Sequence, residues 1–365
     1  MKIAFLAGQS SIHTVKWVNE MAKRGHEVSL ITMHPGTEEI NKNVIVYKLP
    51  FKPPLGYYFN LWNFKKLLKK IKPDILNTHY ASGYGTLARL AGFHPYVLSV
   101  WGSDVYDYPL KSFIHRKIVI KNLINADWIC STSNVMLKQV QSLYPNLKNF
   151  TVVPFGVDTK LFRPCLGLKD QSFVTVGTVK TLAPKYGVDL LVKAFGRVRE
   201  ELRGRSPELF QKLRLLIVGG GPQQVEIERL ANQLGLNEIT QFVGRVPHAE
   251  VPKFLNLLDI YVAASRMESE SFGVAVVEAS ACGIPVIVSN VGGLPKVVKG
   301  GETGLIVERE NVDALSKAML KLIEDPLLRE RMGKAGRQYI LNNFNWDDNA
   351  TLMEKVYVEV LRKKD

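Results

Sequence analysis

Residues 260–289 read IYVAASRMESESFGVAVVEASACGIPVIVS, and this stretch decides the fold. Residues 260–263 form a short run of β-branched, aromatic and small apolar residues, which is typical of a buried strand. A polar loop follows, and an apolar helix begins after Gly273. A second apolar run at 285–289 predicts another buried strand. Strand, helix and strand in this order indicate a βαβ unit of a parallel sheet covered by helices.

The same alternation runs through the rest of the chain. Further strands are predicted at 2–7, 28–32, 75–78, 96–100, 128–131, 172–176, 214–218 and 240–243, and helices at 14–24, 188–199 and 223–234. A segment rich in Pro and Gly, 153–167, separates the two halves. Because 365 residues suffice for two domains, we predict two doubly wound α/β domains, at 1–165 and 166–345, with a cleft between them.

The composition excludes several classes of protein. Hydrophobic residues make up 46% of the chain and charged residues 22%, which excludes a disordered, collagenous or disulfide-dense protein. Cys130, Cys165 and Cys282 are far apart and form no CxxC pair. This usage fits a reducing compartment and argues against a structural zinc site. With no secretory or membrane-spanning pattern visible, we expect a cytoplasmic location.

Positive charge is concentrated in the first half of the chain. The net charge is +14, and residues 1–165 hold 21 Lys and Arg against 9 Asp and Glu. Such a basic half predicts contact with an anionic surface or anionic substrates. The candidates are a membrane leaflet, nucleic acid and the substrates themselves, and because no nucleic-acid module signature is present we expect no nucleic acid.

Residues 61–72 predict a basic amphipathic helix, and the apolar, aromatic stretch 51–59 precedes it. Two interpretations stay open for this segment. The helix and the stretch before it would rest on an anionic membrane leaflet, with a peripheral location for the protein. Alternatively, the helix is an ordinary crossover helix that packs on the sheet and presents a solvated lysine face.

The loop and helix after residue 263 carry the clearest signal for a ligand. Gly273 at the turn lets the backbone N–H groups of residues 272–274 point at an anion, which the helix dipole also favours. Glu278 lies inside the apolar helix, where a carboxylate is costly without partners. Ribose hydroxyls would be suitable donors to it, and Glu270 would meet hydroxyls at the other end of the same ligand. The alternative is that local amides satisfy both carboxylates.

The spacing Glu270-x7-Glu278, within ESFGVAVVEASACGIPVIVSNVGGLPKVV, resembles the signature of retaining glycosyltransferase family 4. The segments HEVSLIT, VVPFGVDTKLFRP, LLIVGGGP, FVGRVPHAEVP and GGETGLIVE occur in the order of that family, over nearly the whole chain. The resemblance implies the GT-B fold, with two Rossmann-like domains and a sugar nucleotide held mostly by the second. It also implies that a C-terminal helix, at about 346–365, packs back on the first domain.

The resemblance assigns roles to residues of the second domain. Glu278 would accept from the ribose hydroxyls and Glu270 from the donor sugar. Lys185 matches the family lysine on the diphosphate, while Thr178 stands where the family has an arginine, so Lys180 would substitute for it. The other donor contacts implied are Gly177, Gly220, Gly221, Arg245, Val246, Ser271, Phe272, Gly273 and Val274. The three glycines at 219–221 equally fit a tight turn, since GxGxxG fails at Gln224.

The first domain departs further from the family pattern. Trp101 occupies the place of the family histidine before a Gly-x-Asp, so this chain departs from the family at that position. Asp104 would bond a hydroxyl or cap a helix, and His79 would touch a ligand or be a structural histidine. With Gly8 and Gln9, these residues form the predicted acceptor side.

The predicted function is retaining transfer of a hexosyl group from a UDP- or GDP-linked sugar to a sugar or lipid-linked acceptor, in polysaccharide or glycolipid synthesis. Glu270, Lys180 and Lys185 are the predicted catalytic residues. No Asp-x-Asp triplet occurs in the chain, so we expect no metal and no cofactor. The alternatives are a sugar-nucleotide epimerase of the same fold and a non-catalytic sugar-nucleotide-binding protein.

Overall fold

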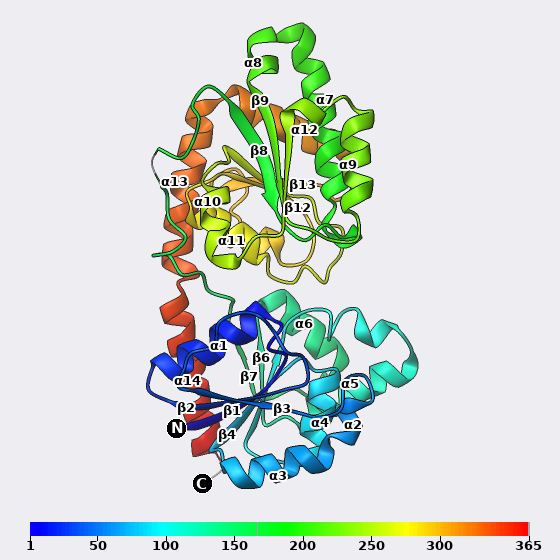
Figure 1. Cartoon of the computed structure of the whole chain (residues 1–365), viewed down its shortest axis with the longest axis vertical. Helices are drawn as coiled ribbons and strands as arrows, with labels where there is room; N and C mark the ends of the chain where they lie inside the picture. Colours follow the sequence, from blue (N-terminus) through cyan, green and yellow to red (C-terminus); the bar gives the residue numbers. More distant parts are fainter. Residues whose placement is uncertain (166, 364–365) are drawn as a thin grey trace. The chain divides into compact units, whose positions relative to one another are not determined.

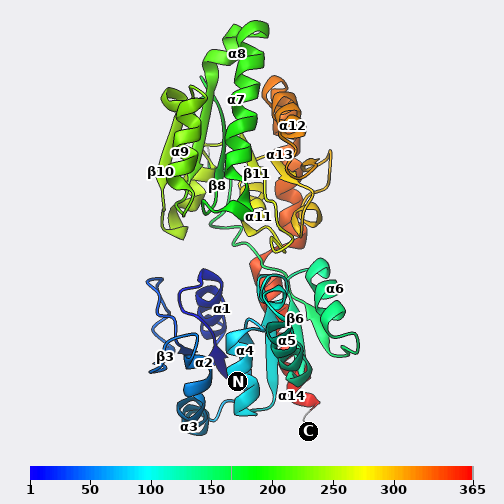
Figure 2. The same cartoon turned by 90° about the vertical axis from the view of Figure 1, so that its right-hand side faces the viewer.

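The computed structural model describes residues 1–165 and 167–363. Residues 166 and 364–365 lie outside the described part, and with them the first residue of the predicted second domain and the end of the predicted C-terminal helix. The chain divides into two compact units (Figures 1 and 2). Unit 1 comprises Met1–Pro154 and Asp347–Asp365, and unit 2 comprises Phe155–Trp346.

This division falls eleven residues before the boundary that the sequence suggests, because the connecting segment packs into unit 2. The Phe155 ring meets Phe272 edge to face, at 5.9 Å between centroids. Phe162 is buried, and the backbone N–H of Cys165 donates to Asn256 Oδ1 at 2.8 Å. Residues 155–165 therefore belong to the second compact unit and not to the first.

Unit 1 contains a seven-stranded parallel sheet among its described residues, in the order β3-β2-β1-β4-β5-β6-β7. The strands are β1 (Lys2–Leu6), β2 (Glu27–Thr32), β3 (Val44–Lys48), β4 (Ile75–His79), β5 (Tyr96–Val100), β6 (Trp128–Ser131) and β7 (Phe150–Val152). The helices are α1 (Ile12–Lys23), α2 (Gly56–Phe59), α3 (Leu61–Ile71), α4 (Gly83–Ala91), α5 (Phe113–Asn125), α6 (Asn134–Leu143) and α14 (Trp346–Arg362), with a 3₁₀ turn, η1, at Tyr108–Leu110.

The C-terminal helix α14 packs on the sheet of unit 1. Tyr357, fully buried, accepts a hydrogen bond on its hydroxyl from Asn77 Nδ2 of β4 at 2.6 Å. Met353 lies against Cys130 of β6, with 4.0 Å between the sulfur atoms. The end of the chain thus completes the core of the unit that the N-terminus begins.

The basic helix α3 buries its apolar side in unit 1. Phe64 and Leu68 are buried, and Leu61, Leu67 and Ile71 pack against the same apolar core. Lys65, Lys66, Lys69 and Lys70 are exposed. The apolar stripe of the predicted helix is therefore used by the protein core, as in the crossover-helix interpretation, and only the lysine face of α3 is left for an anionic surface.

Unit 2 contains a six-stranded parallel sheet among its described residues, in the order β10-β9-β8-β11-β12-β13. The strands are β8 (Val174–Val179), β9 (Leu213–Val218), β10 (Thr240–Gly244), β11 (Ile260–Ala263), β12 (Val286–Ser289) and β13 (Gly304–Val307). The helices are α7 (Val188–Arg205), α8 (Pro207–Lys212), α9 (Gln224–Gln233), α10 (Val251–Leu255), α11 (Val274–Ala281), α12 (Val312–Glu324) and α13 (Pro326–Asn343), with 3₁₀ turns η2 (Pro184–Tyr186), η3 (Asn237–Ile239), η4 (His248–Glu250) and η5 (Leu294–Lys296).

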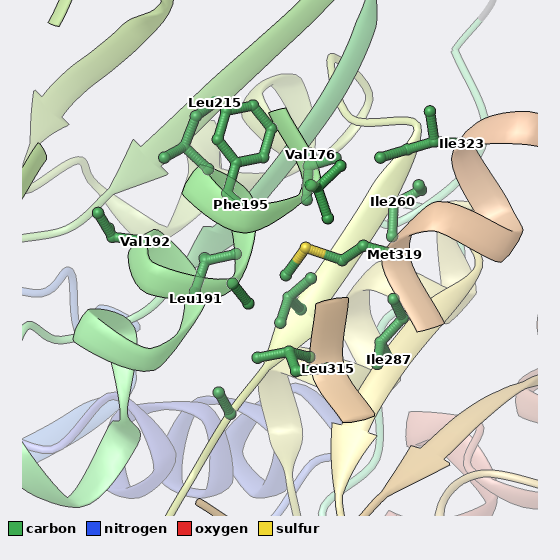
Figure 3. Close-up of a cluster of buried hydrophobic side chains, with 14 of the residues drawn as sticks. Val176, Leu191, Val192, Phe195, Leu215, Ile260, Ile287, Leu315, Met319 and Ile323 are labelled. Carbon is green, nitrogen blue, oxygen red and sulfur yellow. The ribbon is translucent and has the colours of Figure 1, made fainter. Parts of the chain in front are cut away.

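The core of unit 2 lies between its sheet and helices α7 and α12. Figure 3 shows Phe195 and Leu191 of α7 and Met319 of α12 pointing toward the strand residues Val176 and Ile260. These side chains are at most 1% exposed. The tight packing fixes the ends of β8 and β11, where the predicted donor residues begin.

Three strands, β3, β7 and β13, are absent from the sequence prediction. All three lie at the edges of the sheets and are partly exposed. β7 has only three residues, and the short apolar runs of β3 (VIVYK) and β13 (GLIV) cannot be assigned to a strand by periodicity alone. The other strands were predicted with the observed ends, as for 96–100, 128–131 and 260–263, or with ends that differ by up to three residues. Among the described residues, no helix is long and apolar enough to cross a membrane.

Candidate functional site

The predicted donor residues gather at one edge of the unit 2 sheet. Lys180 directly follows β8, Gly220 follows β9, Arg245 follows β10, and Glu270 lies on the loop after β11. These four strands are neighbours and parallel. Their carboxyl ends therefore meet at one edge, which is where open α/β sheets bind ligands.

Lys180 and Glu270 form an ion pair at this edge. Lys180 Nζ donates to Glu270 Oε1 at 3.0 Å, and the Glu270 side chain is only 9% exposed. Burial disfavours the ammonium, but the adjacent carboxylate outweighs burial and raises the pKa of Lys180 above its ordinary value. Lys180 is therefore a permanent cation, and it holds Glu270 in place.

Glu278 of α11 has a partner that the sequence analysis did not single out, His248. His248 Nε2 lies 2.8 Å from Glu278 Oε1, and the carboxylate side chain is 10% exposed. The imidazole also contacts the Phe162 ring, 5.4 Å between centroids. His248 begins η4 and lies thirty residues before Glu278 in the sequence. The one sequence signal for this pairing is that a histidine follows the strand at 240–244, near the sheet edge where Glu278 was expected to bind.

A buried tyrosine lies within the electrostatic influence of both carboxylates. Tyr261 of β11 is fully buried, and its hydroxyl donates to the carbonyl of Val179 at 3.4 Å. Burial raises the pKa of Tyr261 to about 12, the nearby Lys180 ammonium opposes this rise, and the charges of Glu270 and Glu278 add to it. The phenol thus stays neutral beneath a cluster of charged groups.

Lys185 lies beside Lys180 through a shared aromatic ring. The Lys180 and Lys185 ammonium groups lie 4.4 and 4.8 Å from the centroid of Tyr186. Lys185 is half-buried on η2, and its carbonyl accepts from the backbone N–H of Arg266 at 2.8 Å. The structure therefore brings together both predicted lysines and the Glu270 loop.

The loop that carries Glu270 is fixed by a second loop containing Gly292 and Gly293. The N–H of Gly293 donates to the carbonyl of Glu270 at 2.9 Å. A Cβ on Gly292 would overlap the Glu270 carbonyl, and one on Gly293 would overlap that of Ser271. Gly273 has φ +90°, which favours glycine. The buried Ser271 and Phe272, with Gly273 and Val274, thus form a closely packed entry to α11.

The glycines beside this loop serve chain packing. A Cβ on Gly177 would overlap the Leu216 carbonyl, and one on Gly221 would overlap the Leu182 carbonyl. At Gly220 a Cβ would lie 3.0 Å from Arg245 Cγ. Thr178 is buried, while Arg245 is exposed and Val246 half-buried. Gly219, at φ +134°, and Gly221 are therefore required by the turn itself, whereas the neighbour of Gly220 is a flexible side chain. The donor contact of Gly220 and Gly221 stays a prediction.

The residues predicted for the acceptor side lie in unit 1, at the carboxyl ends of β1, β4 and β5. His79 is buried against Trp101, with 4.2 Å between ring centroids, and its Nδ1 lies 3.2 Å from Thr14 Oγ1. Burial lowers the pKa of His79 to about 3. The imidazole is therefore neutral, as expected of a structural histidine.

Asp104 stabilises a loop of unit 1. Its carboxylate is buried and accepts from the backbone N–H groups of Ala81, Trp101 and Gly102 at 2.7, 3.2 and 2.9 Å. Gly8 and Gln9 follow β1, and the Gln9 N–H donates to Thr32 Oγ1 at 3.2 Å. Both oxygens of Asp104 thus have backbone partners.

Comparisons with known proteins identify the family. Residues 166–339 match the family model for glycosyl transferases group 1, and residues 2–133 match that for glycosyl transferase 4-like proteins. The chain is 32% identical over 277 residues to a GDP-mannose-dependent alpha-(1-6)-phosphatidylinositol monomannoside mannosyltransferase of Mycolicibacterium smegmatis, covering 72% of this chain and 69% of the relative. This chain is a family 4, group 1 glycosyltransferase.

Further relatives of this glycosyltransferase support the assignment over most of its length. It is 30% identical to the D-inositol 3-phosphate glycosyltransferase of Kribbella flavida, with 94% and 89% of the two chains covered. The solved sucrose-phosphate synthase of Thermosynechococcus elongatus has the same fold, with a TM-score of 0.86, 22% identity and 99% of each chain covered. The glycosyltransferase thus has the GT-B fold and belongs to the hexosyltransferases.

Proposed function

We propose that this glycosyltransferase transfers a hexosyl group from a UDP- or GDP-linked sugar to an acceptor hydroxyl, with retention and without a metal ion. The observation that carries the proposal is the pair of buried carboxylates at the carboxyl edge of the unit 2 sheet, Glu270 paired with Lys180 and Glu278 with His248. Glu278, held by His248, accepts from the ribose hydroxyls. Glu270 accepts from hydroxyls of the donor sugar.

Lys180 and Lys185 neutralise the diphosphate as it leaves. In the transition state the bond from the anomeric carbon to phosphate breaks while positive charge grows on the sugar ring. Two ammonium groups beside Tyr186 and the N–H groups at the start of α11 stabilise the negative charge that develops. When Lys180 turns to the diphosphate, it releases Glu270 to the sugar. The acceptor hydroxyl bonds to the anomeric carbon from the face that the diphosphate leaves, and its proton passes to the departing phosphate oxygen.

The acceptor that we propose is a glycolipid or lipid-linked sugar used in cell-envelope synthesis, at an anionic membrane surface. A relative named for phosphatidylinositol monomannoside as acceptor supports this choice, as does the net charge of residues 1–165. The predicted acceptor residues Gly8, Gln9, His79 and Trp101 lie at the carboxyl edge of the unit 1 sheet. Asp104 shapes the loop that carries Trp101.

The test is a transfer assay with UDP- and GDP-sugars, with and without lipid extract and with EDTA. We expect transfer that survives EDTA and a product with the anomeric configuration of the donor, read by NMR. Inversion or a requirement for a metal would refute those parts of the proposal. A new sugar nucleotide formed without acceptor would identify an epimerase instead.

Calorimetry tests the donor assignment separately. Glu278→Ala should weaken binding of the nucleoside diphosphate about tenfold or more, because a hydrogen bond to a charged group is lost. Glu270→Ala should reduce transfer with little change in that affinity. Glu238→Ala, an exposed carboxylate of unit 2, is the control. Unchanged affinity in Glu278→Ala would refute the ribose assignment.

A further inference from the structure

Unit 1 exposes large apolar side chains from two segments that are fifty residues apart. The side chains of Trp62, Leu110 and Phe113 are 80%, 83% and 69% exposed, and that of Ile114 is 68% exposed. Leu55, Tyr58 and Phe59 are also exposed. The exposed apolar residues on η1 and at the start of α5 were not part of the sequence prediction. Exposed apolar groups gathered on one region of a soluble domain mark a binding surface.

The two segments adjoin in the fold. α4 packs against α2, α3 and α5, and Figure 1 shows α2, α4 and α5 together in unit 1. Burial raises the pKa of Tyr108 in η1, and the proximity of Tyr58 in α2 raises it further. We name the exposed apolar residues of these adjoining elements, Leu55, Tyr58, Phe59, Trp62, Leu110, Phe113 and Ile114, the apolar face.

Cations surround the apolar face. Residues 51–72 contain six lysines and residues 108–125 contain four lysines and arginines, and neither segment contains a carboxylate. Lys65, Lys66, Lys69 and Lys70 of α3 are exposed, as are Lys111, Arg116 and Lys117. The Lys117 ammonium lies 4.3 Å from the Phe113 ring centroid. Exposed aromatic groups among cations that outnumber the adjacent carboxylate, Asp107, are complementary to an anionic and partly apolar partner.

We propose that the apolar face inserts shallowly into an anionic bilayer surface while the surrounding lysines contact lipid head groups. Aromatic side chains prefer the membrane interface, and clustered lysines bind anionic leaflets. A protein partner is less well matched, because protein interfaces are depleted in lysine. This inference deepens the membrane part of the proposed function. The residues that would enter the bilayer belong to α2, η1 and α5 and include Trp62. The apolar stripe of α3 is buried in the protein core and takes no part.

Trp62 supplies an internal probe. All five tryptophans lie within the described residues, and Trp17, Trp101, Trp128 and Trp346 are buried. A blue shift of the emission on adding vesicles, with quenching by brominated lipid, therefore reports on Trp62. We expect both with vesicles of phosphatidylcholine and phosphatidylglycerol at low salt. The shift should shrink with phosphatidylcholine alone or with added salt, because salt screens exposed charges.

Matched variants separate insertion from general effects of exposed apolar residues. Leu110→Ser with Phe113→Ser should weaken vesicle binding about tenfold or more, since two apolar side chains no longer leave water. Val225→Ser with Leu327→Ser removes two similarly exposed apolar residues from unit 2 and should bind as the wild type does. The tryptophan-fluorescence melting transition of unit 1, which contains four of the five tryptophans, should be unchanged in the Leu110 and Phe113 variant and shows that this unit is folded. Nucleoside diphosphate affinity gives the same check of unit 2 in the Val225 and Leu327 variant.

The proposal fails if the wild type ignores anionic vesicles at low salt, or if the Leu110 and Phe113 variant binds them undiminished. A second outcome also overturns the proposal: the wild type self-associates, the Leu110 and Phe113 variant is monomeric, and both bind vesicles equally. The apolar face would then be the interface between two copies of the chain. Donor affinity is read in unit 2, so failure here leaves the donor assignment untouched. Loss of donor affinity, conversely, would not affect the vesicle result.

Discussion

At the scale of single residues, the site depends on buried carboxylates whose partners come from other loops. Glu270 is paired with Lys180 from the end of β8, and Glu278 is paired with His248 from η4. A buried carboxylate without a partner is costly. Each partner therefore determines where its carboxylate lies and how strongly it can bind a hydroxyl.

His248 is expected to position Glu278 for the ribose. His248→Ala should weaken nucleoside diphosphate binding about tenfold, because Glu278 loses the hydrogen bond that orients it. His248→Gln, which retains an N–H donor, should restore most of the affinity. In a calorimetric double-mutant cycle, the effects of His248→Ala and Glu278→Ala should not add. Additive effects would show that the histidine acts independently of Glu278.

Lys180 is expected to contribute to both stability and turnover. Lys180→Ala should cost about 3 kcal/mol of unfolding free energy, because Glu270 remains buried without its cation. Kinetically, kcat should fall more than KM rises, since the diphosphate charge is largest in the transition state. Denaturant titration and steady-state assays measure the two effects.

Two controls separate these contributions of Lys180. Lys180→Met with Glu270→Gln should recover stability without recovering turnover. Lys185→Met should lower kcat while leaving stability unchanged, although its ammonium lies over the same Tyr186 ring. A Lys180→Ala enzyme with normal stability and kinetics would contradict both roles.

At the scale of elements, charged groups join α14 to α1. Arg24, directly after α1, donates to Glu354 Oε2 of α14 and to Glu20 Oε1, both at 2.7 Å. His26 Nε2 lies 2.7 Å from Glu354 Oε1. Burial alone would raise the pKa of Glu354, but the hydrogen bonds from His26 and Arg24 outweigh it and hold that pKa below its ordinary 4.5.

Arg24→Ala should therefore destabilise unit 1 in a pH-dependent way. Folding lowers the pKa of Glu354 below its ordinary 4.5. The ionised carboxylate therefore contributes its full stabilisation at pH values above 4.5, and this contribution is lost as the pH falls through the lower pKa of the folded protein. The expected loss is about 1–3 kcal/mol near neutral pH, and it should shrink below pH 4.5. Denaturant titrations from neutral to acidic pH measure it, with the exposed Lys23→Ala as control. A loss independent of pH would point to packing of the arginine stem.

At the scale of the whole molecule, each unit has its own parallel sheet and its own apolar core. We expect two unfolding transitions in calorimetry. Nucleoside diphosphate at a hundred times its Kd should stabilise only unit 2, by about 2.7 kcal/mol. Unit 1 contains four of the five tryptophans, so fluorescence melting identifies its transition. A nucleotide-dependent shift of the unit 1 transition would contradict the assignment of the donor to unit 2.

The sequence by itself determined the alternation of strands and helices, the two parallel sheets and the strand, loop and helix that carry Glu270 and Glu278. These features are local, since the apolar period and the glycine turn lie within about thirty residues. Tertiary structure alone decided that His248 meets Glu278, that Lys180 pairs with Glu270, that residues 155–165 join unit 2 and that α3 buries its apolar stripe. Such contacts depend on how parallel strands bring distant loops to one sheet edge and on which face of a helix finds the core. The spacing of residues along the chain does not determine which loops meet at a sheet edge or which helix face is buried.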